Sequence, residues 1–188
     1  YVHYIGKLHL NLHSEKNYKL LIDVARREKI QNNHTATHLL HQSLREIVGN
    51  HVSQKGSLVN EQKLRLDYTS NEPLSEDKIR EIEFLVNSSI RSNIVSKIEH
   101  MPLKNAIQSG AIALFGEKYP ENVRVLSIKS DNQIKSFVSV ELCGGTHVKS
   151  TGEIGFFKII NETSISSGIR RIEAVSYTHL RAHETGSY

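Results

Sequence analysis

Several residue types are scarce in this chain. It contains no tryptophan, one cysteine, one methionine and three prolines, and aromatic residues make up only 6%. A single cysteine excludes a disulfide framework within the chain and is typical of a reducing, cytoplasmic setting. No apolar run is long enough to cross a membrane and the start does not resemble a signal peptide, so we expect no membrane partner. The few aromatic residues also provide no array on which single-stranded nucleic acid could stack.

Length and charge limit the possibilities only moderately. With 188 residues, 38% of them hydrophobic and 23% charged, the chain can bury one sizeable core, which indicates one domain plus a fragment. The formal net charge of +4 allows contact with an anionic partner without requiring one.

Two histidines lie four residues apart in His34-Thr-Ala-Thr-His38. The helical period from Asn33 to Gly49 places apolar residues on one stripe beside them, and Gly49 is expected to end the helix. Histidines at positions i and i+4 lean the same way from successive turns and can share one metal ion. Alone, such a pair is weak evidence, because it more often marks solvated or internally satisfied histidines.

The chain's only cysteine strengthens the pattern. It lies in Cys143-Gly-Gly-Thr-His147, directly after a segment from Ser136 to Leu142 that is expected to form a strand. The two glycines predict a tight turn, with a thiolate and an imidazole on opposite sides of one loop. Two histidines and a cysteine, with or without the last histidine, suit one zinc ion better than iron, magnesium or calcium. His41 projects from nearly the same helix face as His38, and periodicity does not exclude it as a ligand.

Four segments follow one another in the order Asn33-His-Thr-Ala-Thr-His-Leu-Leu-His41, His51-Val-Ser-Gln-Lys-Gly-Ser-Leu-Val59, Leu142-Cys-Gly-Gly-Thr-His147 and Gly168-Ile-Arg-Arg-Ile-Glu-Ala-Val175. Together they resemble the editing domain of alanyl-tRNA synthetases. Related domains occur in threonyl-tRNA synthetases and in free-standing alanyl-tRNA editing proteins. The cysteine motif, with Ala113-Leu-Phe-Gly-Glu-Lys-Tyr119, resembles the alanyl branch.

The resemblance implies a hydrolase that removes serine or glycine wrongly esterified to the acceptor end of tRNA(Ala). It implies one zinc ion held by four side chains and leaves His41 out; the four are His34, His38, Cys143 and His147. It also places Gln54 in the editing pocket, where the sequence alone would make it a polar residue of a Gln-Lys-Gly turn.

A shell of four protein ligands is typical of structural zinc, whereas catalytic zinc usually keeps an open position. We therefore expect the backbone amides near Gly144 and Gly145, or the tRNA ribose, to contribute more to hydrolysis.

Specificity and tRNA contact involve three further candidates. A pocket built for alanine cannot exclude glycine by size, and it rejects serine only weakly, so an editing pocket must bind what alanine lacks. Thr35 is one candidate for a hydrogen bond to the seryl hydroxyl; equally, it is interpreted as a helix N-terminal residue that bonds its own backbone. Paired arginines usually form a solvated face, but Arg170 and Arg171 follow a Ser-Ser-Gly loop, and we expect them to contact phosphate.

Beyond the site, the sequence predicts an α+β domain, in which a mainly antiparallel sheet is packed by helices around the zinc. A second helix is expected from Ser75 to Ser96, with Ser75 as its cap, and a short one at 102–109. The remaining predicted elements are a hairpin of strands 123–128 and 136–142 around Asp131-Asn132, and two strands at 154–161 and 169–174.

The two ends are expected to lie outside this domain, which spans 26–175. Residues 1–25 alternate like strands and resemble the end of a β-barrel that precedes the editing domain. Ser176 to Tyr188 resembles a translated sequencing adapter, so this segment, including His179 and His183, is set aside. The chain would then be a piece of an alanine-tRNA ligase whose ATP- and magnesium-dependent ligase domain is absent here, because no phosphate-binding glycine loop is visible.

Other functions fit less well. A zinc protease needs glutamate after the first histidine, where Thr35 stands, and a nucleobase deaminase needs a Cys-x-x-Cys pair. No DNA partner is expected. The serious alternatives are a non-catalytic, zinc-stabilised tRNA-binding module and a free-standing editing hydrolase that acts in trans.

Overall fold

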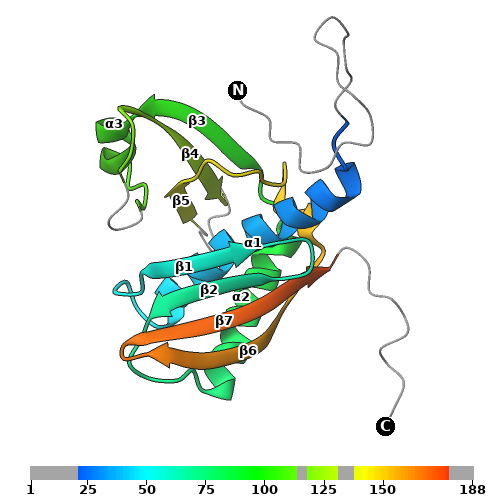
Figure 1. The fold of residues 1–188 in the computed structure, drawn as a ribbon, viewed down its shortest axis with the longest axis vertical. Coiled ribbons are helices and arrows are strands. Elements are labelled where there is room, and N and C mark those ends of the chain that lie inside the picture. The colour runs from blue at the N-terminus through cyan, green and yellow to red at the C-terminus, as the bar shows by residue number, and fades with distance from the viewer. Residues whose placement is uncertain (1–20, 114–117, 131–137, 178–188) are drawn as a thin grey trace, which may run out of the picture.

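Two antiparallel sheets lie on either side of a long helix, α1, in the computed structural model of the chain (Figure 1). The structure describes residues 21–113, 118–130 and 138–177. One sheet has four strands in the order β1-β2-β7-β6, and the other has three in the order β3-β4-β5. The α+β class with antiparallel pairing is confirmed, but the single sheet that we expected is divided into two. Among the described residues, no helix is both long and apolar enough to span a membrane.

Helix α1 carries the two histidines of the first motif. It runs from Val24 to Ile47, and the side chain of Asp23 caps it by accepting a hydrogen bond from the amide of Arg26 at 3.0 Å. Gly49, with φ of 135°, follows its end as predicted. The helix begins nine residues before the predicted start. Sequence periodicity did not reveal its first turns, because they are exposed and carry no apolar stripe. The expected domain boundary at 25 and 26 therefore falls inside α1.

Helix α2 packs the four-stranded sheet on the same side as α1. It runs from Glu76 to Arg91 and begins at the predicted cap, because the Ser75 hydroxyl accepts from the amide of Lys78 at 3.3 Å. The side-chain amide of Asn87 donates to the carbonyl of Phe157 and accepts from its amide, at 2.9 Å each, which joins α2 to the edge strand β6. The helix ends before the predicted Ser96, where strand β3 already begins.

The four-stranded sheet buries one face against these helices. Its strands are β1 (Gln54–Val59), β2 (Leu64–Thr69), β6 (Phe156–Ser166) and β7 (Ile169–Tyr177). The first two were not predicted, and Ile154 belongs to a short 3-10 helix, η1 (Thr151–Ile154), instead of a strand. Strand β7 also includes Ser176 and Tyr177, the first two residues of the segment that was set aside. Residues 178–188 lie outside the described residues, as do 1–20.

The three-stranded sheet connects to the same core through one of its faces. It consists of β3 (Ser96–Pro102), β4 (Asn122–Lys129) and β5 (Val138–Leu142), with α3 (Leu103–Gln108) packed on its other face. On β4, Leu126 and Ile128 join the main core, whereas Val123 and Val125 belong to a separate cluster with Ala106 of α3. The predicted hairpin of β4 and β5 is confirmed by their pairing, but its Asp131-Asn132 turn lies outside the described residues.

Candidate metal centre

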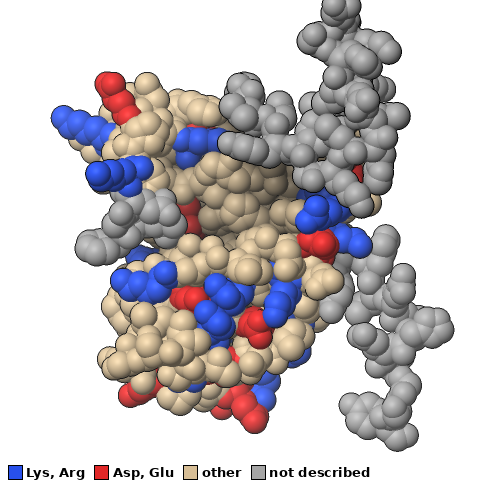
Figure 2. All heavy atoms as spheres, in the orientation of Figure 1, with Lys and Arg blue, Asp and Glu red and all other residues tan. Residues whose placement is uncertain are grey.

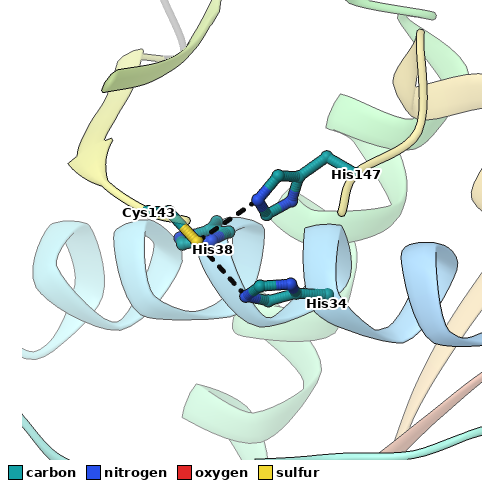
Figure 3. A group of neighbouring side chains, drawn as sticks. All are labelled: His34, His38, Cys143 and His147. Atoms are coloured by element: carbon teal, nitrogen blue, oxygen red, sulfur yellow. Dashed lines mark hydrogen bonds between the residues drawn. The ribbon is translucent and has the colours of Figure 1, made fainter. Parts of the chain in front are cut away.

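Four side chains converge where α1 meets the loop that follows β5. His34 and His38 come from successive turns of α1, and Cys143 and His147 come from the loop. Each of the four offers one donor atom, and these atoms all lie within 4.8 Å of one another. Figure 3 shows the two loop residues facing the helix, with Cys143 Sγ 3.4 Å from His34 Nε2 and 3.3 Å from His147 Nε2. The predicted motif residues therefore form one group across more than a hundred residues of chain.

The chemistry of this group fits a metal ion. Three imidazoles and one thiolate are the donor set preferred by zinc. The Nε2 atom of His38 is buried and has no hydrogen-bond partner among the described residues, so an ion in the group would satisfy it. A cation with these four ligands would be held by two rigid pieces of backbone.

Gly145 is required in the loop for space. A Cβ atom at this position would lie 2.1 Å from Cε1 of His34, which no real side chain tolerates. Its φ is not positive, so the tight-turn argument gave the wrong reason for this glycine. Gly144 differs, because a Cβ there would meet nothing within 4 Å. The loop is therefore closed against α1 at Gly145 and open beside it at Gly144.

Arg124 of β4 fixes the backbone of the same loop. Its Nη1 atom donates to the carbonyl of Cys143 at 2.6 Å and to the carbonyl of Gly145 at 2.8 Å. The amide of Cys143 donates back to the carbonyl of Arg124 at 3.1 Å. Sequence analysis missed this residue, because an arginine in a strand 19 positions before the cysteine carries no local signal.

Thr35 supports the site from inside the helix. It is fully buried and lies in the middle of α1, so it is not the helix N-terminal residue of our alternative interpretation. Its hydroxyl accepts from the amide of Val148 at 3.1 Å and lies 3.4 Å from Nδ1 of His147. The structure thus gives the hydroxyl two partners within the protein, and its contact with a seryl hydroxyl, one of our two interpretations, stays a prediction.

Glu141 is the second residue that the sequence did not reveal. It lies on β5 with only 5% of its surface exposed, and its carboxylate accepts from Nδ1 of His38 at 2.9 Å and from Nδ1 of His41 at 3.2 Å. His41 therefore faces this carboxylate and is not part of the converging group. The sequence offered a clue, because Glu141 stands two positions before Cys143 and alternate residues of a strand point to the same face. A polar residue in a half-buried strand is, however, ordinarily assigned to the solvent side.

The electrostatics of the group favour a thiolate. Burial alone would raise the pKa of Cys143, but the neighbouring imidazoles of His147, His34 and His38 lower it to about 3. Burial together with neighbouring histidines lowers the pKa of His147 to about 4, so this ring is neutral at pH 7. Burial would also raise the pKa of Glu141, yet His38 and His41 hold it well below its usual range. Burial would lower the pKa of His38, but Glu141 and Cys143 raise it to about 10, so a metal ion would displace a proton from this ring. Thiolate sulfur and neutral imidazole are the forms that bind metals.

The remaining predicted site residues lie elsewhere. Gln54 is not in a turn: it starts β1 next to a bulge, and its side-chain amide donates to Ser57 at 3.4 Å. Arg170 forms a two-point ion pair with Glu162, and Arg171 forms one with Asp67 at 2.7 and 2.9 Å. Both guanidinium groups are therefore engaged by carboxylates of the four-stranded sheet. These ion pairs use Nε and Nη2 of each guanidinium, and the contact with phosphate stays a prediction.

Comparison with known proteins gives related sequences for most of the chain. Residues 123–173 match the family model described as the threonyl and alanyl tRNA synthetase second additional domain. The chain is 51% identical over 155 residues to an alanine-tRNA ligase of Pseudoalteromonas translucida and, over the same length, 51% identical to that of Leptothrix cholodnii. Identity to the enzyme of Burkholderia multivorans is 50%. These matches cover 82% of this chain but 17% of each relative. They confirm the resemblance that the four motifs predicted.

Proposed function

We propose that this chain, which is similar to alanine-tRNA ligases over 155 of its residues, is an editing hydrolase that removes serine or glycine from mischarged tRNA(Ala). One observation carries the proposal: four donor atoms of His34, His38, Cys143 and His147 converge within 4.8 Å, and half of them lie inside the segment that matches the synthetase domain. The ligand would be one zinc ion, and the partner would be the acceptor end of the tRNA.

The loop after β5 offers a place for the ester. Gly144 is exposed, with open space where a side chain would be, and it directly follows the cysteine of the group. Because Arg124 binds the carbonyls of Cys143 and Gly145, the peptide groups between them are held in a fixed orientation. Amide groups that are oriented before the substrate arrives can stabilise a developing oxyanion without reorganising. An aminoacyl ester is already activated, so positioning accounts for much of the rate.

When bound, zinc would polarise an ester oxygen or lower the pKa of a water molecule. The chain's own residues hold that ion between α1 and the loop. Thr35 places the ring of His147 through its hydroxyl, and Gly145 leaves the room that the ring of His34 needs. Gln54, partly exposed at the start of β1, is retained in this proposal as a contact for the substrate.

The test is the rate at which purified protein of known zinc content releases serine from serylated alanine tRNA, with alanylated tRNA as the control substrate. We expect fast release of serine and slow release of alanine. Equal rates on both substrates would contradict a discriminating editing pocket, and the absence of release from folded, zinc-loaded protein would contradict hydrolysis by this chain. Replacing Gln54 with alanine should slow serine release without changing the zinc content.

One observation favours a second candidate, a non-catalytic module that binds tRNA. If all four side chains coordinate zinc at once, the shell is closed, and such shells are typical of structural sites. In that case chelation would unfold the protein and abolish tRNA binding, and no ester hydrolysis would occur at any zinc content. Ligation of alanine to tRNA, which gives the relatives their name, would require ATP, magnesium and regions of those proteins that this chain does not match.

A further inference from the structure

A buried carboxylate lies directly behind the candidate metal centre. Glu141 points from β5 toward α1, on the sheet face that also carries Leu126 and Ile128 of the core. Three groups donate to it: His38 Nδ1 at 2.9 Å, His41 Nδ1 at 3.2 Å and the hydroxyl of Ser139 at 3.3 Å. It is the only carboxylate of the described residues that pairs with a histidine of the converging group.

These contacts determine how His38 is oriented. Because Nδ1 donates to the carboxylate, the proton of the neutral ring stays on Nδ1, and the lone pair is on Nε2. The Nε2 atom is the one that is buried without a partner and belongs to the same group as Cys143 Sγ and His34. A carboxylate that holds the distal nitrogen of a metal-binding histidine fixes its tautomer and increases its basicity.

Packing alone does not account for a carboxylate at this position. Burial of an ionised side chain is costly unless it is paired and hydrogen-bonded, and an apolar residue of similar volume would fit beside Leu126 and Ile128 at lower cost. The carboxylate is instead surrounded by donors from α1 and β5. Two of these donors are histidines one helical turn apart, and only one of them reaches the converging group.

We propose that Glu141 is a positioning residue for the metal, which sets the tautomer and direction of His38, and that His41 acts through Glu141 and is not itself a ligand. This inference rests on the metal site of the proposed function. His41 and Ser139 both donate to Oε1 of Glu141, the oxygen that His38 leaves free.

The experiment compares the full chain with Glu141→Gln, His41→Phe and a control, Glu153→Gln. Glu153 is an exposed carboxylate that accepts from the amide of Ser150 and touches no histidine. Zinc affinity is measured by competition with a chromogenic chelator. Cobalt(II) is then substituted, and its thiolate charge-transfer and ligand-field absorption report the ligands directly. Circular dichroism of each metal-free variant separates loss of fold from loss of the site.

Glutamine has nearly the same shape, but its amide group would face an imidazole N–H, so one histidine must turn away. We expect the zinc affinity of Glu141→Gln to fall by about 10- to 100-fold, with an altered cobalt spectrum, while Glu153→Gln remains unchanged. His41→Phe should keep the wild-type cobalt spectrum and lose less affinity. If Glu141→Gln fails to fold, Ser139→Ala provides the same comparison more mildly, with a several-fold loss expected.

Three outcomes would overturn the inference in different ways. Affinity and spectrum of Glu141→Gln within twofold of wild type would remove the positioning role and leave the metal site intact. Loss of the charge-transfer band in His41→Phe would make His41 a ligand. If the wild-type chain binds neither zinc nor cobalt, the metal site itself fails, and with it both this inference and the proposed function.

Discussion

Two groups of charged side chains in the described part of the chain can be compared, and they differ in how their members are paired. In the four-stranded sheet, Arg170 pairs with Glu162, which also accepts from the hydroxyl of Tyr68 at 3.0 Å, and Arg171 pairs with Asp67. Each of these two arginines has a carboxylate partner. Between α1 and the loop after β5, four donor atoms converge on one another, and Nε2 of His38 has no partner in the described part of the chain.

The difference indicates which group is built for a ligand. Charges that satisfy one another stabilise a fold and leave nothing for a substrate or an ion to complete. In the group between α1 and the loop, Nε2 of His38 is buried without a hydrogen-bond partner, which is costly unless something binds there. Figure 2 shows that basic and acidic side chains lie side by side on the visible face of the four-stranded sheet, as expected for paired charges. From residue type alone, the arginine pair and the histidines would be equally good candidates for a ligand-binding site.

Among the variants that test this comparison, removal of a metal-binding side chain should have the largest effect. Replacing Cys143 with alanine takes away the one thiolate of the group, and we expect zinc affinity to fall by more than ~100-fold, beyond the loss typical of an outer-shell residue. The thermal midpoint measured with excess zinc should fall toward that of the metal-free protein, because binding no longer stabilises the fold. Equal zinc content in wild type and Cys143→Ala, measured by atomic emission after dialysis, would contradict the cysteine as a ligand.

A methyl group in the loop should give the next largest effect. In Gly145→Ala the new Cβ would overlap the ring of His34, whereas in Gly144→Ala it would meet nothing within 4 Å. We expect zinc affinity to fall by about 10- to 100-fold in the first variant, because the ring must leave its position, and to stay unchanged in the second. The two variants differ by one position and have the same chemistry, so chelator competition on both isolates the close approach. Equal affinities would show that His34 does not need this space.

For the ion pairs of the four-stranded sheet we expect the opposite result, which is a loss of stability without a loss of zinc affinity. Replacing Arg170 with glutamine leaves Glu162 without its ion-pair partner, and we expect the thermal midpoint to fall by about 5 °C. Zinc affinity and binding of tRNA should remain as in wild type, because the guanidinium serves the sheet. Arg80→Gln, which breaks an exposed ion pair on α2, should change neither property. A large loss of tRNA binding in Arg170→Gln, with stability preserved, would restore the phosphate contact that the sequence suggested.

The sequence predicted those parts of the molecule that have local signals. The helix around His34, the cap at Ser75 and the pairing of β4 with β5 all follow from periodicity and turn chemistry, and the structure confirms them. The converging group was predicted because its residues form two short motifs. Strands β1 and β2 pair with each other, but they were missed because their burial does not alternate cleanly. The second partner of β2 is β7, which lies far along the chain.

The supporting residues were missed for a related reason. Glu141 contacts two histidines of α1, and Arg124 contacts backbone carbonyls of the loop after β5. Both contacts join segments that are separate in the sequence, and neither residue belongs to a motif. Arg170 and Arg171 were assigned to phosphate because a basic pair after a loop is a local pattern, whereas their carboxylate partners depend on strand register. All of these contacts depend on tertiary structure, which no short stretch of the sequence reveals.

The smallest predicted effect comes from the hydroxyl that completes the sheet group. Burial and the neighbouring carboxylate of Glu162 raise the pKa of Tyr68 above its ordinary value near 10. Above that pH the unfolded chain releases this proton while the folded chain retains it, so the free energy of unfolding should decline as pH rises past 10. In Tyr68→Phe this contribution disappears, at a cost of about 1 kcal/mol at neutral pH for the lost hydrogen bond. Urea unfolding of both proteins between pH 8 and pH 11 provides the measurement, since other tyrosines and lysines titrate equally in both. Parallel pH profiles would show that the stability of the protein does not depend on this proton. A free energy of unfolding that declines more steeply with pH in the wild type than in Tyr68→Phe would show that the folded protein retains the proton of the Tyr68 hydroxyl.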